Sequence, residues 1–128
     1  MHSNNYVLGR EGENTIAEYY KQNGYTLVAQ NFNFYSSNKI GEIDLILEKE
    51  QKLYLVEVKT RNNTEENQKY GSSGSQILRK KMQALFKSYQ AFIKRYKQYQ
   101  KYSAQFDLAC IYNGQIKVTP NAYNFDGF

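Results

Sequence analysis

The feature that most constrains this fold is a pair of segments in which apolar and polar residues alternate, 41–48 (GEIDLILE) and 53–60 (LYLVEVKT). A period of two is typical of β-strands that bury one face. A short connection between the segments favours an antiparallel hairpin, with its turn at Glu50 and Gln51. These two strands are expected to lie at the centre of a sheet.

The apolar residues set the register of this hairpin, although a different turn would shift the pairing. The predicted pairs on the apolar face are Ile43 with Val58, Leu45 with Val56, and Leu47 with Tyr54. On the polar face Asp44 falls opposite Glu57, and Glu42 falls opposite Lys59. Opposed residues have Cβ atoms roughly 4.5–5.5 Å apart. The register therefore predicts two carboxylates side by side.

Periodicity and chain-breaking residues predict the other elements. They are a helix at 9–23, a strand at 25–34, a helix at 76–101, and strands at 105–112 and 115–119. Asn113-Gly114 is a hairpin turn signal between the last two strands, and Pro120 is expected to end the second. The order αβββαββ predicts one α/β domain over 1–128, of three-layer or open-sheet type. Residues 61–75, rich in Gly and Ser, are expected to form a flexible loop.

The helix at 76–101 has one apolar stripe and an opposite basic face. Its stripe consists of Leu78, Met82, Leu85, Tyr89, Phe92 and Tyr96, and its opposite face carries Lys80, Lys87, Lys94 and Lys101. Lys81 lies at the edge of the stripe, so its side chain is expected to face the sheet.

Charge is unevenly distributed along the chain, whose formal net charge is +5. No acid occurs from Asn67 to Phe106, a segment that is rich in Lys and Arg. A cationic surface of this kind suits a polyanion, although Lys87, Lys94 and Lys101 fit a solvated helix face equally well. A single cysteine, no membrane-length apolar run and no signal-like leader predict a cytoplasmic protein without a membrane partner.

Opposed acids normally destabilise a hairpin unless a cation offsets their repulsion or both point into water. Asp44 and Glu57 with Lys59 nearby suit Mg²⁺, which is commonly held by one or two carboxylates and a substrate phosphate. Lys59 would then orient water or stabilise charge on a phosphoryl oxygen. The alternative is a hydrated sheet face with incidental salt bridges.

Asp44 followed by Glu57-Val58-Lys59 is similar to the Asp-(x)n-Glu-x-Lys signature of the PD-(D/E)XK nuclease superfamily. The longer frame includes Gly12-Glu13, Gly24-Tyr25, Gly41-Glu42-Ile43-Asp44, Phe106-Asp107 and Asn121-Ala122-Tyr123. With this frame, the chain from about Gly9 to Phe125 resembles the YraN family of small bacterial proteins. That family is related to archaeal Holliday-junction resolvases and restriction endonucleases. The superfamily's proline is replaced by Ile43, and Gln105 stands where the family tends to have Arg.

The resemblance implies a restriction-endonuclease-like mixed central sheet flanked by helices. It also implies a DNA endonuclease that uses Mg²⁺ or Mn²⁺, with branched or structured DNA among its expected substrates. It implies metal ligands at Glu13, Asp44, Glu57 and the Val58 carbonyl, and catalytic roles for Glu13, Asp44, Glu57, Lys59 and Lys81. Arg61, Arg79 and Lys80 are expected to contact nucleic acid, and a homodimer is expected by analogy with the resolvases. Glu13 also fits an ordinary helix N-terminal acid, and Arg61 a loop cap. A non-catalytic nucleic-acid-binding module and a small protein-interaction adaptor are the alternative functions.

Overall fold

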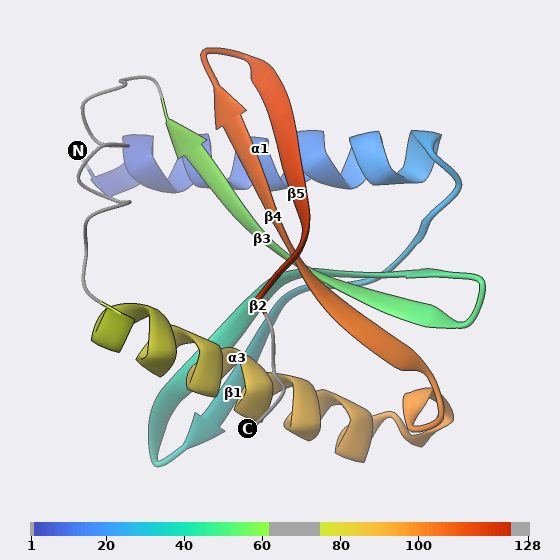
Figure 1. Ribbon diagram of the computed structural model, residues 1–128. Coiled ribbons are helices and arrows are strands. Elements are labelled where there is room, and N and C mark those ends of the chain that lie inside the picture. The colour runs from blue at the N-terminus through green and yellow to red at the C-terminus, as the bar shows by residue number, and fades with distance from the viewer. Residues whose placement is uncertain (1, 62–74, 124–128) are drawn as a thin grey trace.

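A computed structural model describes residues 2–61 and 75–123 and shows a central sheet between two α-helices (Figure 1). The elements are α1 (His2–Gln22), β1 (Thr26–Ser36), β2 (Asn38–Lys49), β3 (Lys52–Arg61), α3 (Ser75–Arg95), the 3-10 helix η1 (Lys97–Tyr99), β4 (Ser103–Tyr112) and β5 (Gln115–Tyr123). The predicted order αβββαββ is confirmed, and the architecture is consistent with a restriction-endonuclease-like fold. The predicted loop at 61–75 lies outside the described residues except at its two ends.

The five strands form one mixed sheet in the order β1-β2-β3-β4-β5. Neighbouring strands are antiparallel except β3 and β4, which run parallel and are separated along the chain by α3. Figure 1 shows that the sheet is strongly twisted, with α1 and α3 on opposite sides. Within the described ranges, none of the helices combines the length and apolar character that crossing a bilayer requires.

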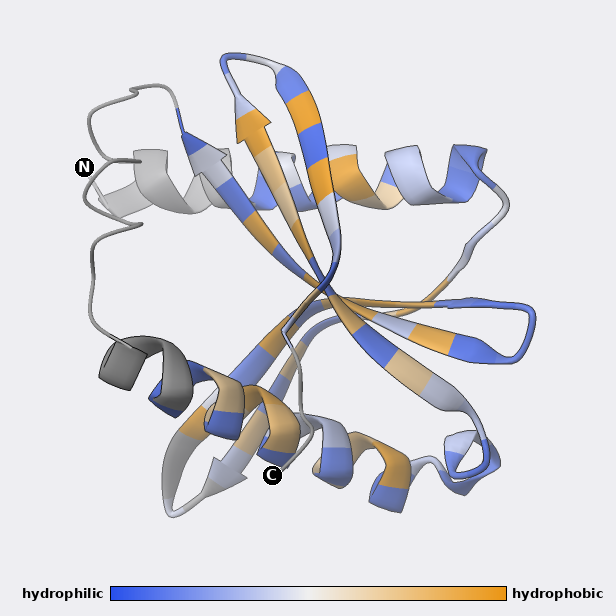
Figure 2. Ribbon diagram, in the orientation of Figure 1, coloured by the Kyte–Doolittle hydropathy of each residue, from blue (hydrophilic) through white to orange (hydrophobic). Residues whose placement is uncertain are grey.

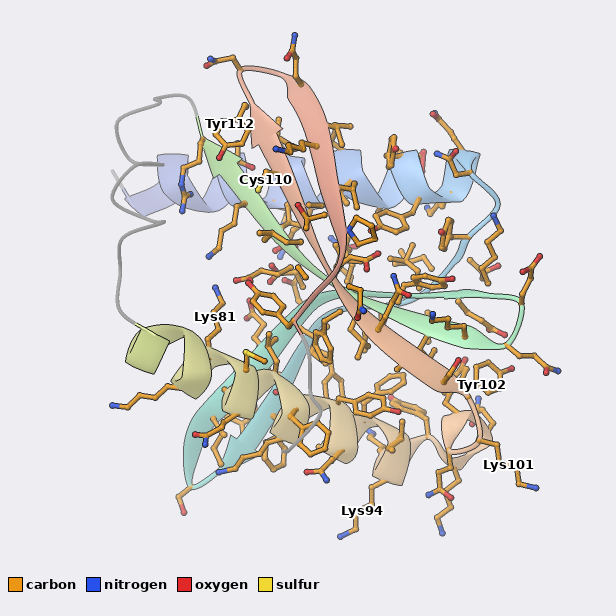
Figure 3. All side chains as sticks on the ribbon, viewed as in Figure 1. Lys81, Lys94, Lys101, Tyr102, Cys110 and Tyr112 are labelled. Atoms are coloured by element: carbon orange, nitrogen blue, oxygen red, sulfur yellow. The ribbon has the colours of Figure 1, made fainter. Side chains whose placement is uncertain are left out.

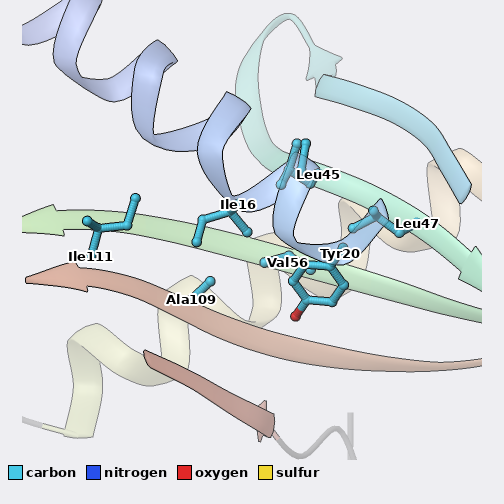
Figure 4. Packing of buried hydrophobic residues seen from close by; sticks show 8 residues of the cluster. Ile16, Tyr20, Leu45, Leu47, Val56, Ala109 and Ile111 are labelled. Atoms are coloured by element: carbon cyan, nitrogen blue, oxygen red, sulfur yellow. The ribbon is translucent and has the colours of Figure 1, made fainter. Parts of the chain in front are cut away.

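Two apolar clusters fill the spaces on either side of the sheet, and Figure 2 shows apolar and polar residues alternating along its strands. The cluster beneath α1 contains Ile16, Ala17, Tyr20, Leu45, Leu47, Val56, Ala109 and Ile111 (Figure 4). The cluster beneath α3 contains Ile43, Ile46, Leu53, Leu55, Leu85, Phe92, Phe106 and Tyr123. Burial of this apolar surface is the main favourable contribution to folding.

The predicted hairpin register is confirmed from Leu45↔Val56 to Lys49↔Lys52. Its turn residues Glu50 and Gln51 have φ values of 52° and 62°, as a two-residue turn of type I′ requires. The pairs predicted beyond Leu45 are wrong, because the described pairing ends there. The Val58 N–H donates instead to Asp44 Oδ2 at 2.9 Å, so a side chain replaces the expected backbone partner.

Ile43 corrects the sequence prediction in a second way. It was expected to share a face with Leu45 and Leu47, but it belongs to the cluster beneath α3, whereas they belong to the cluster beneath α1. Near Asp44, therefore, the side of β2 that faces α1 changes: Leu45 packs beneath α1, but Ile43 packs beneath α3. The polar residues described below are gathered near this point of the two strands.

The long helix ends at Arg95 rather than at 101. Tyr96 leaves the helical region with φ −114° and ψ 82°, and η1 follows. This turn brings the Tyr99 ring over Phe92, with ring centroids 5.6 Å apart and planes at 25°. Aromatic packing of this kind stabilises the bend beyond the simple burial of area. Lys101 consequently lies in the exposed turn before β4 and not on the helix (Figure 3).

Pro120 does not end β5, which continues to Tyr123. The register between β4 and β5 shifts between Phe106 and Leu108, and Asn121 has a φ of 53°. An irregularity of this type tolerates proline because the local ladder is already interrupted. The buried carboxylate of Asp107 accepts the Asn121 N–H at 3.0 Å, which links β4 to β5 at this irregularity.

Candidate active site

Polar side chains gather in a pocket of about 250 Å³ where β2 and β3 separate beneath α3. The pocket is lined by Glu42, Asp44, Glu57, Lys59, Lys81, Ala84 and Leu85. Four predicted site residues, Asp44, Glu57, Lys59 and Lys81, therefore lie around one cavity. The two central carboxylates face the same space, as the sequence argument required, although they do not form the predicted cross-strand pair.

The charged side chains that the strands bring to the pocket come as two pairs, one on β2 and one on β3. Glu42 and Asp44 are two residues apart on β2, and Glu57 and Lys59 are two residues apart on β3. On β3 this spacing puts both side chains on one side. On β2 the alternation is broken, since Ile43 and Leu45 belong to opposite clusters, and the pocket lining itself shows that Glu42 and Asp44 lie together. The hydrogen bond from Val58 N–H fixes the Asp44 carboxylate between the strands, so both pairs face one cavity.

Glu57 lies at the centre of a network of three donors. Tyr123 Oη donates to its Oε1 at 2.7 Å, and Lys59 Nζ lies 3.3 Å from its Oε2. Lys81 forms a second ion pair with Oε2 and extends from α3 toward the strands (Figure 3). Burial alone would raise the pKa of Glu57, but the hydrogen bond and charge of Lys81, then Tyr123 and Lys59, hold it below its usual range.

Asp44 has the opposite electrostatic environment. Burial raises its pKa from 3.8 to about 7, against the lowering effect of the Val58 N–H. A hydrogen bond with Glu42 and the negative charges of Glu13 and Glu42 raise it further. Asp44 forms no ion pair with the described residues. The pocket thus has a balanced half at Glu57 and an acidic half at Asp44.

Two glycines allow the layers to approach closely enough to build this site. A methyl group on Gly12 would collide with the Thr60 hydroxyl, and one on Gly41 would collide with Ser88 and with the Ala84 carbonyl. Gly12 therefore brings α1 against β3, and Gly41 brings β2 against α3. Each glycine directly precedes an acid, Glu13 or Glu42, so the close contacts also position two of the charges around Asp44.

Glu13 comes near this group without lining the pocket. Its Oε1 accepts a hydrogen bond from Gln30 Nε2 at 3.5 Å, and its pKa is raised, chiefly by burial. Its negative charge nevertheless acts on Asp44. Glu13 therefore lies close enough for its charge to affect Asp44, and its predicted role as a metal ligand stays a prediction.

The residues predicted to contact nucleic acid lie outside the pocket lining. Arg61 ends β3 and its Nη1 donates to the Thr60 carbonyl at 3.1 Å. Lys80 is exposed on α3, next to Lys81. Arg79 belongs to α3, but its side chain lies outside the described part of the chain.

The structure places two residues in the site, Glu42 and Tyr123, to which no role was assigned from the sequence. Glu42 had a usable signal, because the predicted hairpin register places it on the polar face together with Asp44. Tyr123 had no local signal, since it reaches Glu57 across a sequence separation of 66 residues. Its position depends on the irregular path of β5 past Pro120.

The donor set fits a hard divalent cation. Carboxylate oxygens from Glu42, Asp44 and Glu57 line one small cavity, and Mg²⁺ commonly takes one or two carboxylates together with waters and substrate phosphate. Across the ranges that the structure describes, no three Asp, Glu, His or Cys side chains form a ready-made metal cage. An ion at this site would therefore take part of its coordination from water or substrate.

Comparison with known proteins places the same segment in a family. The model for "Uncharacterised protein family UPF0102" matches residues 12–111, which include every residue that lines the pocket. A UPF0102 protein of Persephonella marina is 30% identical over 94% of this chain and 97% of its own length. One from Clostridium botulinum strain Loch Maree is 30% identical over 96% and 98%. One from Acinetobacter baylyi is 34% identical over 80% and 68%.

Proposed function

This chain belongs to the UPF0102 (YraN-like) family, and we propose that it is a metal-dependent nuclease of the PD-(D/E)XK type that hydrolyses phosphodiester bonds in DNA. The observation that carries the proposal is the pocket in which Asp44, Glu57 and Lys59 meet. Two carboxylates and a lysine from adjacent strands form the minimal set for holding a divalent ion and activating water beside a phosphate.

In this proposal Asp44 and Glu57 would hold Mg²⁺ or Mn²⁺, the Val58 carbonyl would be a further ligand, and Glu13 would add charge from α1. The chemistry that a bound ion supplies is a lowered pKa for coordinated water and neutralised charge on the scissile phosphate. The acidic half of the pocket at Asp44, which has no described cationic partner, favours a cation there.

The lysines act on the other half. Lys59 and Lys81 both contact Glu57 Oε2, so their ammonium groups are held at the cavity rather than extended into solvent. From there Lys59 positions the attacking water and stabilises negative charge on the phosphoryl oxygens. Lys81 adds a second positive charge at the rim, and Tyr123 keeps the Glu57 carboxylate in place.

Affinity for DNA would come from the basic surface. Lys80, Lys87 and Lys94 are exposed along α3, and Arg61 and Arg79 flank the segment that joins β3 to α3. Contacts of this kind to phosphates give affinity that is sensitive to salt and largely independent of sequence. A homodimer that cuts two strands remains part of the proposal.

The test is cleavage of labelled duplex, flapped and four-way-junction DNA in Mg²⁺, in Mn²⁺ and in EDTA. We expect ion-dependent cleavage that falls about 100-fold or more in Asp44→Asn and in Lys59→Met. Lys52→Met, which changes a lysine at the other end of β3, and Glu11→Gln, which changes an exposed acid on α1, are the matched controls.

Two results would contradict the proposal. Cleavage that persists in both Glu57→Gln and Lys59→Met would indicate a contaminating nuclease. Salt-sensitive DNA binding without cleavage under any of these conditions would instead favour a non-catalytic nucleic-acid-binding module.

A further inference from the structure

A second hollow, of about 620 Å³, lies beside the acidic pocket along α3. Its apolar surface comes from Phe34, Ile40 and Ala91, and its rim carries Lys87, Lys94 and Arg95. No acidic residue is among the described residues that line it. We call this hollow the α3 groove.

The lining of the α3 groove specifies a ligand with two properties. The apolar residues, which include the half-buried ring of Phe34, suit a flat and weakly polar group. Lys87 and Lys94 are exposed at the rim, and neither is paired with a described carboxylate. Figure 3 shows Lys94 extending outward from α3. An unpaired nucleotide has both a base that stacks on an aromatic ring and a phosphate that binds lysine.

The α3 groove and the acidic pocket are neighbours on the same two elements. Along β2, Ile40 lines the groove and Glu42 lines the pocket, and Gly41 between them packs against α3 at Ala84 and Ser88. Along α3, Ala84 lines the pocket and Ala91 lines the groove. The separation of seven positions between Ala84 and Ala91 corresponds to about 10 Å of helix, the length of about three stacked nucleotides.

We propose that the α3 groove binds unpaired nucleotides a few positions from the phosphate that enters the acidic pocket. The substrate class is then nucleic acid in which a single-stranded segment adjoins the cleavage point, because the bases of an intact duplex are stacked on one another. This inference rests on the proposed nuclease function for the identity of the neighbouring pocket. It adds a binding site and a preference that the pocket alone does not specify.

The experiment measures binding by fluorescence anisotropy in EDTA, so that it does not depend on cleavage. The probes are a labelled single strand, a blunt duplex and the same duplex with a single-stranded overhang. The wild type is expected to bind the overhang more tightly than the blunt end. Phe34→Leu, which keeps an apolar side chain, should weaken binding of the single strand and the overhang about tenfold and leave the blunt duplex unchanged.

The charge contribution is tested separately, with exposed residues whose replacement does not disturb packing. Lys87→Gln/Lys94→Gln should reduce the slope of log K against log salt by roughly 1.4 for the single strand, because two phosphate contacts are lost. Lys101→Gln/Lys117→Gln removes two exposed lysines outside the groove and is the matched control. Unfolding midpoints should agree among all of these variants.

The outcomes separate this inference from the proposed function. Groove variants that lose single-strand affinity support the inference, even in a protein that cuts nothing. Equal affinity for all three probes, or loss of affinity that is the same in the control double variant, would overturn it, even if the enzyme cleaves DNA. Tighter, groove-dependent binding of an acidic peptide containing phenylalanine would also overturn it, because the occupant would then be a protein segment.

Discussion

Replacing Asp44 by Asn should make the protein more stable at alkaline pH. Asp44 has a pKa of about 7 in the folded protein and an ordinary value of 3.8. Between these values the unfolded chain binds fewer protons than the folded one, so stability falls as the pH rises from about 4 to about 7. Above pH 7 the full cost remains, and the difference between the two pKa values corresponds to about 4 kcal/mol.

Asparagine removes this cost while keeping the local geometry. It has nearly the shape of aspartate, and its side-chain oxygen can still accept the hydrogen bond from Val58 N–H. We therefore expect Asp44→Asn to raise the free energy of unfolding by about 2–4 kcal/mol at pH 8.5. At pH 4 the gain should be about 0.5 kcal/mol, because the cost accumulates between the two pKa values and only its first part is present at that pH.

The assay is urea unfolding followed by circular dichroism at both pH values, without divalent ions. Glu11→Gln is the matched control, because Glu11 is exposed on α1 and should give little change at either pH. Adding Mg²⁺ should stabilise the wild type more than the variant, since the ion offsets the same charge. A variant no more stable than the wild type at pH 8.5 would refute the reasoning, and a gain that is equal at both pH values would show that charge is not its cause.

Three further substitutions test the packing that positions the site. Gly41→Ala should lower the free energy of unfolding, measured in urea, by about 1–3 kcal/mol, because the new methyl group meets the Ala84 carbonyl. An unchanged unfolding midpoint would show that the close contact between β2 and α3 is not required. Tyr123→Phe should lower the free energy of unfolding by about 1 kcal/mol above pH 4.5 and by less in acid. The reason is that the lowered pKa of Glu57 stabilises the fold only where the unfolded carboxyl is ionised. A loss independent of pH would contradict the network of donors around Glu57. Leu47→Ala should lower the free energy of unfolding by about 2–5 kcal/mol, and a smaller loss would contradict its complete burial beneath α1.

The parts of the fold that follow from short-range pattern could be predicted from the sequence. The hairpin turn at Glu50 and Gln51 and the register from Leu45 to Lys49 follow from apolar alternation, and the structure confirms them. The pairing failed at Asp44 because a side-chain acceptor competes with the backbone for the Val58 N–H. Alternation of residue types carries no information about that competition.

Packing and pairing at the ends of elements account for the other differences. The helical pattern continued to 101, but the rings of Tyr96 and Tyr99 pack near Phe92 and the helix ends at Arg95. Similarly, proline usually marks the end of a strand, yet the chain passes Pro120 by shifting its register. In each case the end of the element depends on side-chain packing or strand pairing that the hydropathy pattern does not specify.

The site shows the same division between local and distant information. Helical geometry was enough to predict that Lys81 faces the sheet, and its ion pair with Glu57 agrees. The opposed acids suggested that a metal ion must balance both charges, whereas the structure balances Glu57 with lysines and leaves the acidic surplus at Asp44. That asymmetry depends on α3 and β5, which lie far from the hairpin in the sequence.

The measurement that tests the central claim most directly is an anomalous difference map from a crystal soaked in Mn²⁺ at a pH above 7. The account predicts a peak within the pocket beside the Asp44 carboxylate, and loss of that peak in Asp44→Asn. A map with no peak in the pocket, or a peak of equal height in the variant, would contradict the assignment of this pocket as a metal-dependent active site.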